Sequence, residues 1–239
     1  MARDFTKDTA NLMEFGTDSI NSLLAGAAFL SIHAIVKADS FSDDNVSGFN
    51  RICSVFINTG NVNGLILSLS DVNAGGIKVN VGGRSKSADA FQSGQGTTVV
   101  GTGSEVSVGG VLDFGGDLIR VYYEGTQEFS GAQTFGNTTY TADGTPNQSD
   151  RIGARESTST NYQFDGSIAE LAIWNVDITT AGFAMLADRF SPLMIRPDGL
   201  VCYWSLLGNN SPETEIINAK NGTITGTIES NTFENNDNQ

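Results

Sequence analysis

The chain has few basic residues. Thirteen lysines and arginines stand against 27 aspartates and glutamates among its 239 residues, which gives a formal net charge of −14 at pH 7. Proteins bind nucleic acids and anionic membrane surfaces through clustered lysine and arginine side chains. The basic residues here are scattered singly along the sequence. We therefore expect neither a nucleic acid nor a membrane as a partner.

Cysteine and histidine are also scarce. Two cysteines, Cys53 and Cys202, are too few for a secreted scaffold held together by disulfides, so we predict that both are reduced thiols. His33 is the single histidine, which leaves little room for a histidine-dependent catalytic triad. The sequence also lacks the alternating carboxylates of glycanases and the G-x-S-x-G, H-E-x-x-H and phosphate-loop motifs. We therefore predict that the protein is not an enzyme.

Long apolar runs are absent too. The apolar stretch from Leu23 to Val36 is shorter than the roughly 20 residues that a membrane-spanning helix needs. The first residues, MARDFTKDTANLMEF, are polar and lack the apolar core of a signal peptide. We therefore expect a protein that is made in a cytoplasm without a signal peptide.

Short alternating segments and turns make up most of the chain. In AFLSIHAIVKADS, Ile32, Ala34 and Val36 fall on one face of a strand and His33 and Ile35 on the other, because successive side chains of a strand point to opposite faces. Further segments of this kind are separated by Asn-Gly and Gly-Gly pairs, which are typical of hairpin turns. With 28 glycines, the pattern predicts an all-β protein built from antiparallel strands.

One segment follows a helical period instead. In TTAGFAMLADRF, Phe183, Leu186, Ala187 and Phe190 have the spacing i, i+3, i+4 and i+7, which places them on one face of a helix. Thr179 can cap the first turn. The spacing predicts one short helix near residues 180–190.

Two segments, one in the middle of the chain and one after it, are the most informative. GGVLDFGGDLIRVYYEG, at residues 109–125, predicts a hairpin in which Gly115 and Gly116 supply the positive φ angles of the turn. FDGSIAELAIWN, at residues 164–175, predicts another strand that opens at Asp165 and Gly166. Trp174 ends this strand, and we expect it to be buried.

The order and spacing of these segments resemble the laminin-G-like (concanavalin A-like) jelly roll. The end of the chain, with SPLMIRPDGLVCYWSLLG and NGTITGT, is similar to a variant of this fold that occurs in structural proteins of tailed phages. The resemblance covers about residues 23–228. It implies that a set of residues forms the framework of the fold, namely Asp113, Gly115, Gly116, Gly125, Gly153, Gly166, Glu170 and Trp174.

The resemblance implies a two-sheet antiparallel jelly-roll sandwich over residues 12–199, preceded by an N-terminal arm at residues 1–11. Residues 200–239 are expected to form a hairpin and a polar tail, packed on the sandwich or on a neighbouring subunit. The function implied is that of a non-enzymatic virion protein (capsid decoration, head-fibre or tail-associated) that assembles in the host cytoplasm with other virion proteins and with its own copies. The alternative is a carbohydrate-binding, lectin-like module that acts in attachment to a host surface glycan.

Three groups of residues are candidate sites. Relatives of the jelly roll often hold calcium at the rim, and Asp39, Asp43 and Asp44 form an acidic cluster there, although such clusters also occur in ordinary solvated loops. No other cofactor is expected. Tyr122 and Tyr162 are candidates for stacking on a glycan, although strand aromatics are often core residues. Tyr203 and Trp204, in an apolar strand that must be covered, are candidates for assembly contacts.

Overall fold

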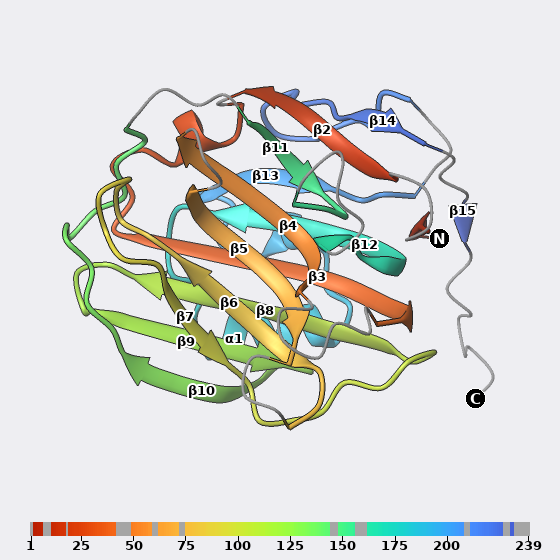
Figure 1. Ribbon diagram of the computed structural model, residues 1–239, viewed down its shortest axis with the longest axis horizontal. Helices are drawn as coiled ribbons and strands as arrows, with labels where there is room; N and C mark the ends of the chain where they lie inside the picture. The colour runs from red at the N-terminus through yellow and green to blue at the C-terminus, as the bar shows by residue number, and fades with distance from the viewer. Residues whose placement is uncertain are drawn as a thin grey trace.

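The computed structural model describes residues 2–6, 11–17, 19–41, 49–58, 62–71, 75–143, 148–155, 162–207, 211–226 and 230–231. The strands form two antiparallel sheets, as Figure 1 shows. The elements in chain order are β1 (Ala2–Phe5), β2 (Leu12–Thr17), η1 (Asn21–Leu24), β3 (Phe29–Ser40), β4 (Phe49–Asn58), β5 (Val62–Ser70), β6 (Lys78–Gly83), β7 (Gln92–Gln95), β8 (Glu105–Asp113), β9 (Leu118–Tyr123), β10 (Thr126–Ala132), β11 (Ser149–Ile152), β12 (Asp165–Trp174), α1 (Thr179–Ala187), η3 (Pro192–Met194), β13 (Leu200–Trp204), β14 (Thr223–Thr225) and β15 (Ser230–Asn231).

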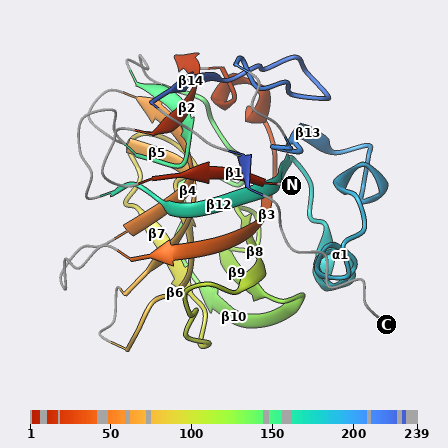
Figure 2. The same ribbon diagram turned by 90° about the vertical axis from the view of Figure 1, so that its right-hand side faces the viewer.

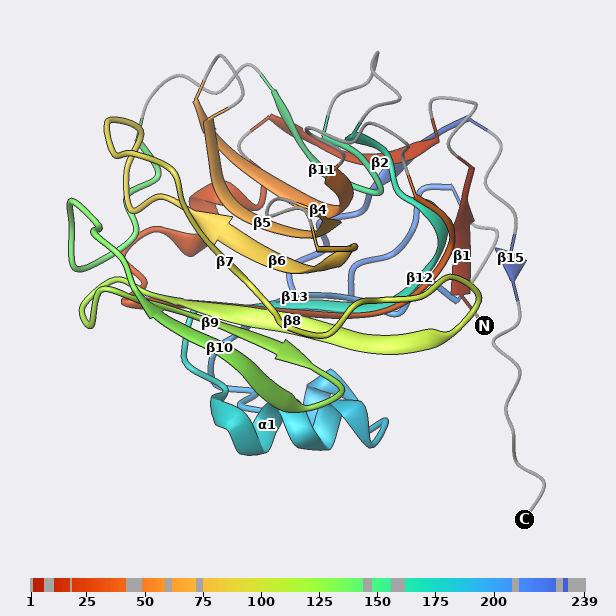
Figure 3. The ribbon, with the colours of Figure 1, turned by 60° about the horizontal axis from the view of Figure 1, so that its bottom comes forward.

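The sheets stack face to face around one apolar core. Sheet A has the strand order β10-β9-β8-β3-β12-β1-β15, with β13 also paired to β12, and sheet B has the order β14-β2-β11-β4-β5-β6-β7. In β3, Ile32, Ala34 and Val36 point into this core, as the alternation predicts. His33 lies on the opposite face, where α1 covers part of sheet A (Figure 3). The all-β sandwich with one short α-helix is confirmed.

A second apolar cluster joins α1 to the outer face of sheet A. Phe183 stacks on Tyr122 with ring centroids 3.9 Å apart, and Trp174 is fully buried in the same cluster. The Trp174 Nε1–H donates to the carbonyl of Ile195 at 2.7 Å, so the indole is both packed and hydrogen-bonded. The predicted burial of Trp174 is confirmed.

The start of α1 differs from the prediction. Thr179 is the first helical residue and its side chain does not cap the helix. Instead, the Asp177 carboxylate accepts a hydrogen bond from the Thr179 N–H at 2.8 Å. The helix ends at Ala187, so Phe190 lies beyond it and is 43% exposed. The predicted apolar stripe therefore loses Phe190, because the chain leaves the helical path after Ala187.

The β8–β9 hairpin forms at the predicted place with a different turn. Neither Gly115 nor Gly116 has a positive φ; that angle occurs at Asp117, with φ 51°. The Asp113 carboxylate accepts a hydrogen bond from the Gly116 N–H at 2.8 Å, and a Cβ at Gly116 would lie 2.6 Å from Asp113 Oδ2. The Asp113 side chain therefore packs closely against Gly116 and closes the turn. Among the other framework residues, positive φ angles occur at Gly125, Gly153, Gly166 and Glu170.

The N-terminal residues belong to a sheet. The sequence predicts an arm at residues 1–11, whereas Ala2–Phe5 form β1, which pairs with β12 from Arg3↔Ile168 to Phe5↔Gly166. Figure 2 shows β1 lying along β12. Local patterning cannot reveal this pairing, because its partner lies more than 160 residues away in the sequence.

The C-terminal residues do not form the expected hairpin. β13 pairs with β12 from Leu171↔Trp204 to Trp174↔Leu200, and β14 pairs with β2 in sheet B. The apolar strand β13 is buried along its whole length. It is therefore covered by its own domain, and the segment contributes to both sheets. A role of this region in subunit contacts stays a prediction.

Both cysteines are free and buried. Cys53 and Val55 belong to the same apolar core, and burial raises the pKa of both thiols. The described segments contain no helix that has both the length and the apolar character needed to cross a membrane.

Candidate functional site

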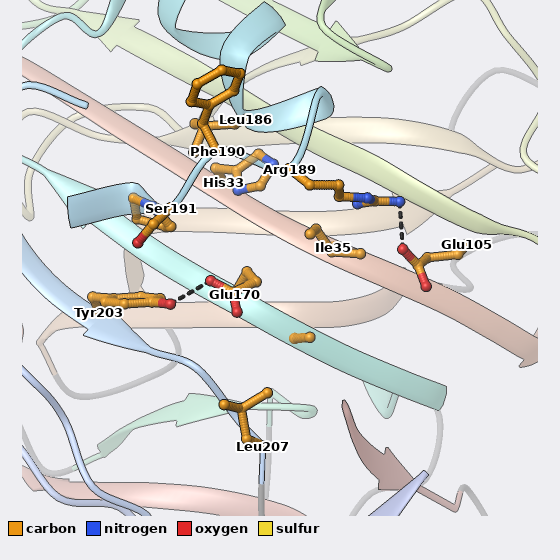
Figure 4. A pocket seen from close by; sticks show the side chains of 12 residues that line it. His33, Ile35, Glu105, Glu170, Leu186, Arg189, Phe190, Ser191, Tyr203 and Leu207 are labelled. Carbon is orange, nitrogen blue, oxygen red and sulfur yellow. Dashed lines mark hydrogen bonds and ion pairs between the residues drawn. The ribbon is translucent and has the colours of Figure 1, made fainter. Parts of the chain in front are cut away.

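A pocket opens on the outer face of sheet A, next to the end of α1 (Figure 4). Its volume is about 290 Å³, at the small end of the range typical of ligand sites. Strands β3, β8, β12 and β13 form its floor, and the segment that follows α1 forms a wall. The lining residues are His33, Ile35, Glu105, Ala169, Glu170, Leu186, Arg189, Phe190, Ser191, Pro192, Tyr203 and Leu207.

An irregularity in β12 brings Glu170 into this pocket. The pairing of β12 with β3 shifts register between Ala169 and Ala172, and Glu170 lies in that interval with φ 50°. β1 pairs with β12 up to Ile168, and β13 pairs from Leu171 onward. Glu170 thus lies on β12 at the point where β1 ends as the partner strand and β13 begins. A bulge at such a point can redirect a side chain.

Glu170 and Tyr203 form a hydrogen-bonded pair. The Tyr203 hydroxyl donates to the Glu170 carboxylate, as Figure 4 shows. Burial raises the pKa of Glu170, and the hydrogen bond from Tyr203 opposes that rise. Burial is also the main reason why the pKa of Tyr203 is raised. The pair therefore offers a fixed hydroxyl and a carboxylate with free lone pairs.

A second polar pair closes another side of the pocket. Arg189 follows α1 with φ 66°, and its guanidinium forms an ion pair with the Glu105 carboxylate on β8. The Arg189 side chain is 42% exposed and that of Glu105 is 25% exposed. Both groups therefore remain accessible to a ligand, and Ile35 lies between the two polar pairs (Figure 4).

His33 lies in the floor of the pocket as a neutral group. Its Nε2 is 2.9 Å from the Ser107 hydroxyl, and the residue is 1% exposed. Burial lowers the pKa of His33 to about 3, because a charged imidazole is disfavoured away from water. At physiological pH His33 is a hydrogen-bonding partner and not a cation.

This depressed pKa predicts a pH-dependent loss of stability. Between about pH 6.5 and pH 3 the unfolded chain binds a proton at His33 that the folded chain excludes, so the free energy of unfolding falls as the pH is lowered. We expect His33→Gln to remove this component. In urea titrations, the stability of wild type relative to this variant should fall by about 2 kcal/mol between pH 7 and pH 5. If this difference in stability did not change with pH, His33 would take up its proton in the folded protein as it does in the unfolded chain.

The structure separates the aromatic residues that the sequence singles out. Tyr122 is 1% exposed beneath α1, so it offers no face to a glycan. Tyr203 lines the pocket. Trp204 is fully buried, packs on Phe15 at 4.7 Å and donates to the carbonyl of Lys220. The assembly role expected of Tyr203 and Trp204 stays a prediction.

Tyr162 has a different environment. It is half-buried and stacks with Phe49 at a centroid distance of 6.4 Å. The Arg155 guanidinium lies 4.5 Å from the centre of its ring. Tyr162 thus remains a candidate for ligand contact, at a place remote from the pocket.

The structure describes one of the three calcium candidates. Asp39 is exposed near the end of β3, and Asp43 and Asp44 lie outside the described residues. In the part of the chain that the structure describes, no group of three or more histidine, cysteine or acidic side chains could hold a metal ion. Calcium binding at Asp39, Asp43 and Asp44 stays a prediction.

The pocket itself is not recognisable in the sequence. Glu170 is identified there as a framework residue, whereas Glu105 and Arg189 belong to no motif. The one signal is that FDGSIAELAIWN places a glutamate in an otherwise apolar strand, a position that usually requires a partner. The pocket arises from pairings between segments far apart in the chain.

Comparison with known proteins places the fold. No model of a known protein family matches the chain, and no curated protein matches it. A candidate carbohydrate-binding protein from Bacteroides ovatus is similar in structure, with TM-score 0.68, 19% identity and coverage of 96% of this chain and 59% of that one. This chain therefore spans about three fifths of that protein.

Two further structures share the architecture. The heptameric SAP-like pentraxin from Limulus polyphemus has TM-score 0.61 and 15% identity, with 94% of each chain covered. The CBM40 domain of the Ruminococcus gnavus IT-sialidase, bound to α2,3-sialyllactose, has TM-score 0.55 and 15% identity, with 78% of this chain and 95% of that domain covered. The protein therefore has the jelly-roll sandwich fold of these domains.

Proposed function

We propose that the protein is a non-enzymatic carbohydrate-binding module and that the pocket beside α1 holds the sugar. The observation that carries this proposal is the combination of two polar pairs, Glu170–Tyr203 and Glu105–Arg189, with exposed apolar side chains around them. Two of the similar folds are a candidate carbohydrate-binding protein and a domain bound to sialyllactose, which supports the proposal by analogy of fold.

The groups in the pocket match the chemistry of a sugar. Each sugar hydroxyl both donates and accepts hydrogen bonds; the carboxylates of Glu170 and Glu105 accept, and the Arg189 guanidinium donates. Phe190 and Leu207 are 43% and 46% exposed, so they can cover the apolar C–H face of the ring. A small pocket with a few placed polar groups and apolar walls is a typical ligand site.

Binding measurements with pocket variants test this proposal. After a glycan array identifies a ligand, calorimetry should show an affinity about 5- to 10-fold lower for Tyr203→Phe, which loses one hydrogen bond. Arg189→Ala should weaken binding by roughly 10-fold or more, because a charged donor is lost. Tyr123→Phe and Arg196→Ala are matched controls that lie outside the pocket and should bind as wild type does.

The outcomes separate the function from the site. No ligand on a broad glycan array would contradict carbohydrate binding. A ligand whose affinity is unchanged in both pocket variants would place binding elsewhere. A carboxylate pair also invites a test for hydrolysis, and cleavage of the bound glycan would overturn the non-enzymatic assignment.

We further propose that the module acts on a tailed-phage particle, in attachment to a host glycan. Support comes from the resemblance of residues 191–208 and 221–227 to phage structural proteins. Mass spectrometry of purified particles tests this location, and absence of the protein from every particle fraction would contradict it.

A further inference from the structure

The outer face of sheet B carries a row of polar residues. In β5 and β6, Leu67, Leu69 and Val79 point into the core between the sheets. Ser68 and Asn80 alternate with them and are paired across the two strands, so their side chains point to the outer face. This face is opposite the one that carries the pocket and α1.

The row continues onto β4 and beyond it. Arg51 is the register partner of Ser68, and Gln163 forms an isolated parallel bridge with Arg51. Gln163, Arg51, Ser68 and Asn80 therefore follow one another across neighbouring backbone segments. An arginine, two amides and a hydroxyl thus form a polar line across the sheet.

These side chains are buried and incompletely hydrogen-bonded. Arg51 is 4% exposed, Asn80 1%, and Ser68 and Gln163 are fully buried. The Nε and Nη1 atoms of Arg51, both amide atoms of Gln163 and the Ser68 hydroxyl have no hydrogen-bond partner within the described structure. Buried polar groups are nearly always paired, so a run of unpaired atoms on one face calls for a physical reason.

Arg51 differs from the other buried arginines in its surroundings. Arg3 is paired with Glu213, and Arg151 with Glu14, whereas among the described residues no carboxylate forms an ion pair with Arg51. Burial, and then the positive charge of the nearby Arg155, lower the pKa of Arg51 to about 9. The guanidinium is still a cation at neutral pH, and a buried unpaired cation is costly.

Two aromatic rings hold the guanidinium groups in place. The Arg51 guanidinium lies 4.7 Å from the centre of the Phe49 ring, and Arg155 lies 4.5 Å from the centre of Tyr162. The two rings stack on each other at 6.4 Å. Stacking engages the planar face of the Arg51 guanidinium and leaves its N–H edge for hydrogen-bond acceptors.

We propose that Arg51 and Gln163, on the outer face of sheet B, form a second binding site, for an oxyanion carried on a hydroxylated molecule such as an acidic sugar. Arginine is the preferred donor to carboxylate, sulfate and phosphate groups. Gln163 and Ser68 supply donors and acceptors for hydroxyl groups beside the anion. The ligand would thus satisfy the atoms that the protein leaves unpaired. This site does not depend on the pocket in sheet A.

Thermal unfolding with chemically matched ligands tests this proposal. Glucuronate should raise the melting temperature of the full chain, by roughly 5–10 °C at a hundredfold excess over Kd, whereas glucose should not. Inorganic phosphate at the same ionic strength forms the second arm. A response to phosphate as well identifies a site for the anion alone, and a response to glucuronate only shows that hydroxyl groups are also recognised. No response to either would overturn the proposal.

Variants of Arg51 test whether this residue produces the rise in melting temperature. Arg51→Met removes an unpaired buried charge, so we expect it to fold with at least wild-type stability and to lose the response to glucuronate. Arg51→Lys keeps the charge without the planar donor edge and should bind at least tenfold more weakly. Arg196→Met is the matched control on an exposed surface. An unchanged response in Arg51→Met and Arg51→Lys would overturn the site, while the pocket variant Tyr203→Phe should respond as wild type does.

Discussion

Replacing Asp150 with alanine should destabilise the protein by about 3–5 kcal/mol. Asp150 is fully buried in β11. Its Oδ2 accepts hydrogen bonds from the backbone N–H groups of Ile20 at 2.6 Å and Asn21 at 3.2 Å, and its Oδ1 accepts from the Phe56 N–H at 3.0 Å. One carboxylate therefore fastens the start of η1 and the end of β4 to β11. Its removal leaves three buried donors without that acceptor, and each costs about 1–3 kcal/mol when unpaired.

Urea unfolding of three variants measures this effect. Asp150→Asn keeps one acceptor oxygen and should lie between wild type and Asp150→Ala. Asp71 is the matched control, because its carboxylate also accepts from a backbone N–H, that of Gly75 at 2.8 Å, on an exposed loop. Asp71→Ala should change the free energy of unfolding by less than about 1 kcal/mol. A similarly small change for Asp150→Ala would show that water replaces the carboxylate.

The features that the sequence predicts correctly depend on local alternation. The inward face of β3 follows from period two, and the position of the β8–β9 hairpin follows from apolar segments around Gly115 and Gly116. Trp174 is buried because it belongs to the apolar face of β12 that α1 covers. Each of these inferences uses neighbours within about ten residues of sequence, where the geometry of a strand or turn decides the outcome.

The predictions that are wrong concern strands whose pairing partner is distant in the sequence, and a turn whose geometry is changed by a side chain. The apolar alternation of β13 fits any sheet edge, so it cannot show that β12 is its partner. In the β8–β9 turn, the Asp113 carboxylate binds the Gly116 N–H, and the positive φ moves to Asp117. The pocket depends on where β1 and β13 meet along β12. The polar row on sheet B depends on the pairing register of β4, β5 and β6. Register of this kind is set by the whole sheet.

The ion pair between Arg3 and Glu213 gives the last prediction, in which removal of one partner should be far more damaging than removal of both. Arg3 lies on β1 and is 1% exposed, and Glu213 is 5% exposed. Their side chains form a buried ion pair between residues 210 positions apart. Glu213 is itself held by two backbone hydrogen bonds with Gly222, at 2.9 and 3.0 Å, so the pair ties the first strand to the C-terminal segment.

Glu213→Gln removes the negative charge that faces the buried Arg3 cation, and we expect a loss of about 3–5 kcal/mol. The double variant Arg3→Met/Glu213→Leu removes both charges and should be within about 1–2 kcal/mol of wild type, because apolar groups of similar size often replace a buried pair well. Urea titrations of the wild type, the single variants Arg3→Met and Glu213→Leu, and the double variant give the coupling energy directly. Arg196→Met, which breaks an exposed pair with Asp198, should be indistinguishable from wild type. Additive losses in the cycle would mean that the two charges act independently, and that the two ends of the chain are held together by strand pairing alone.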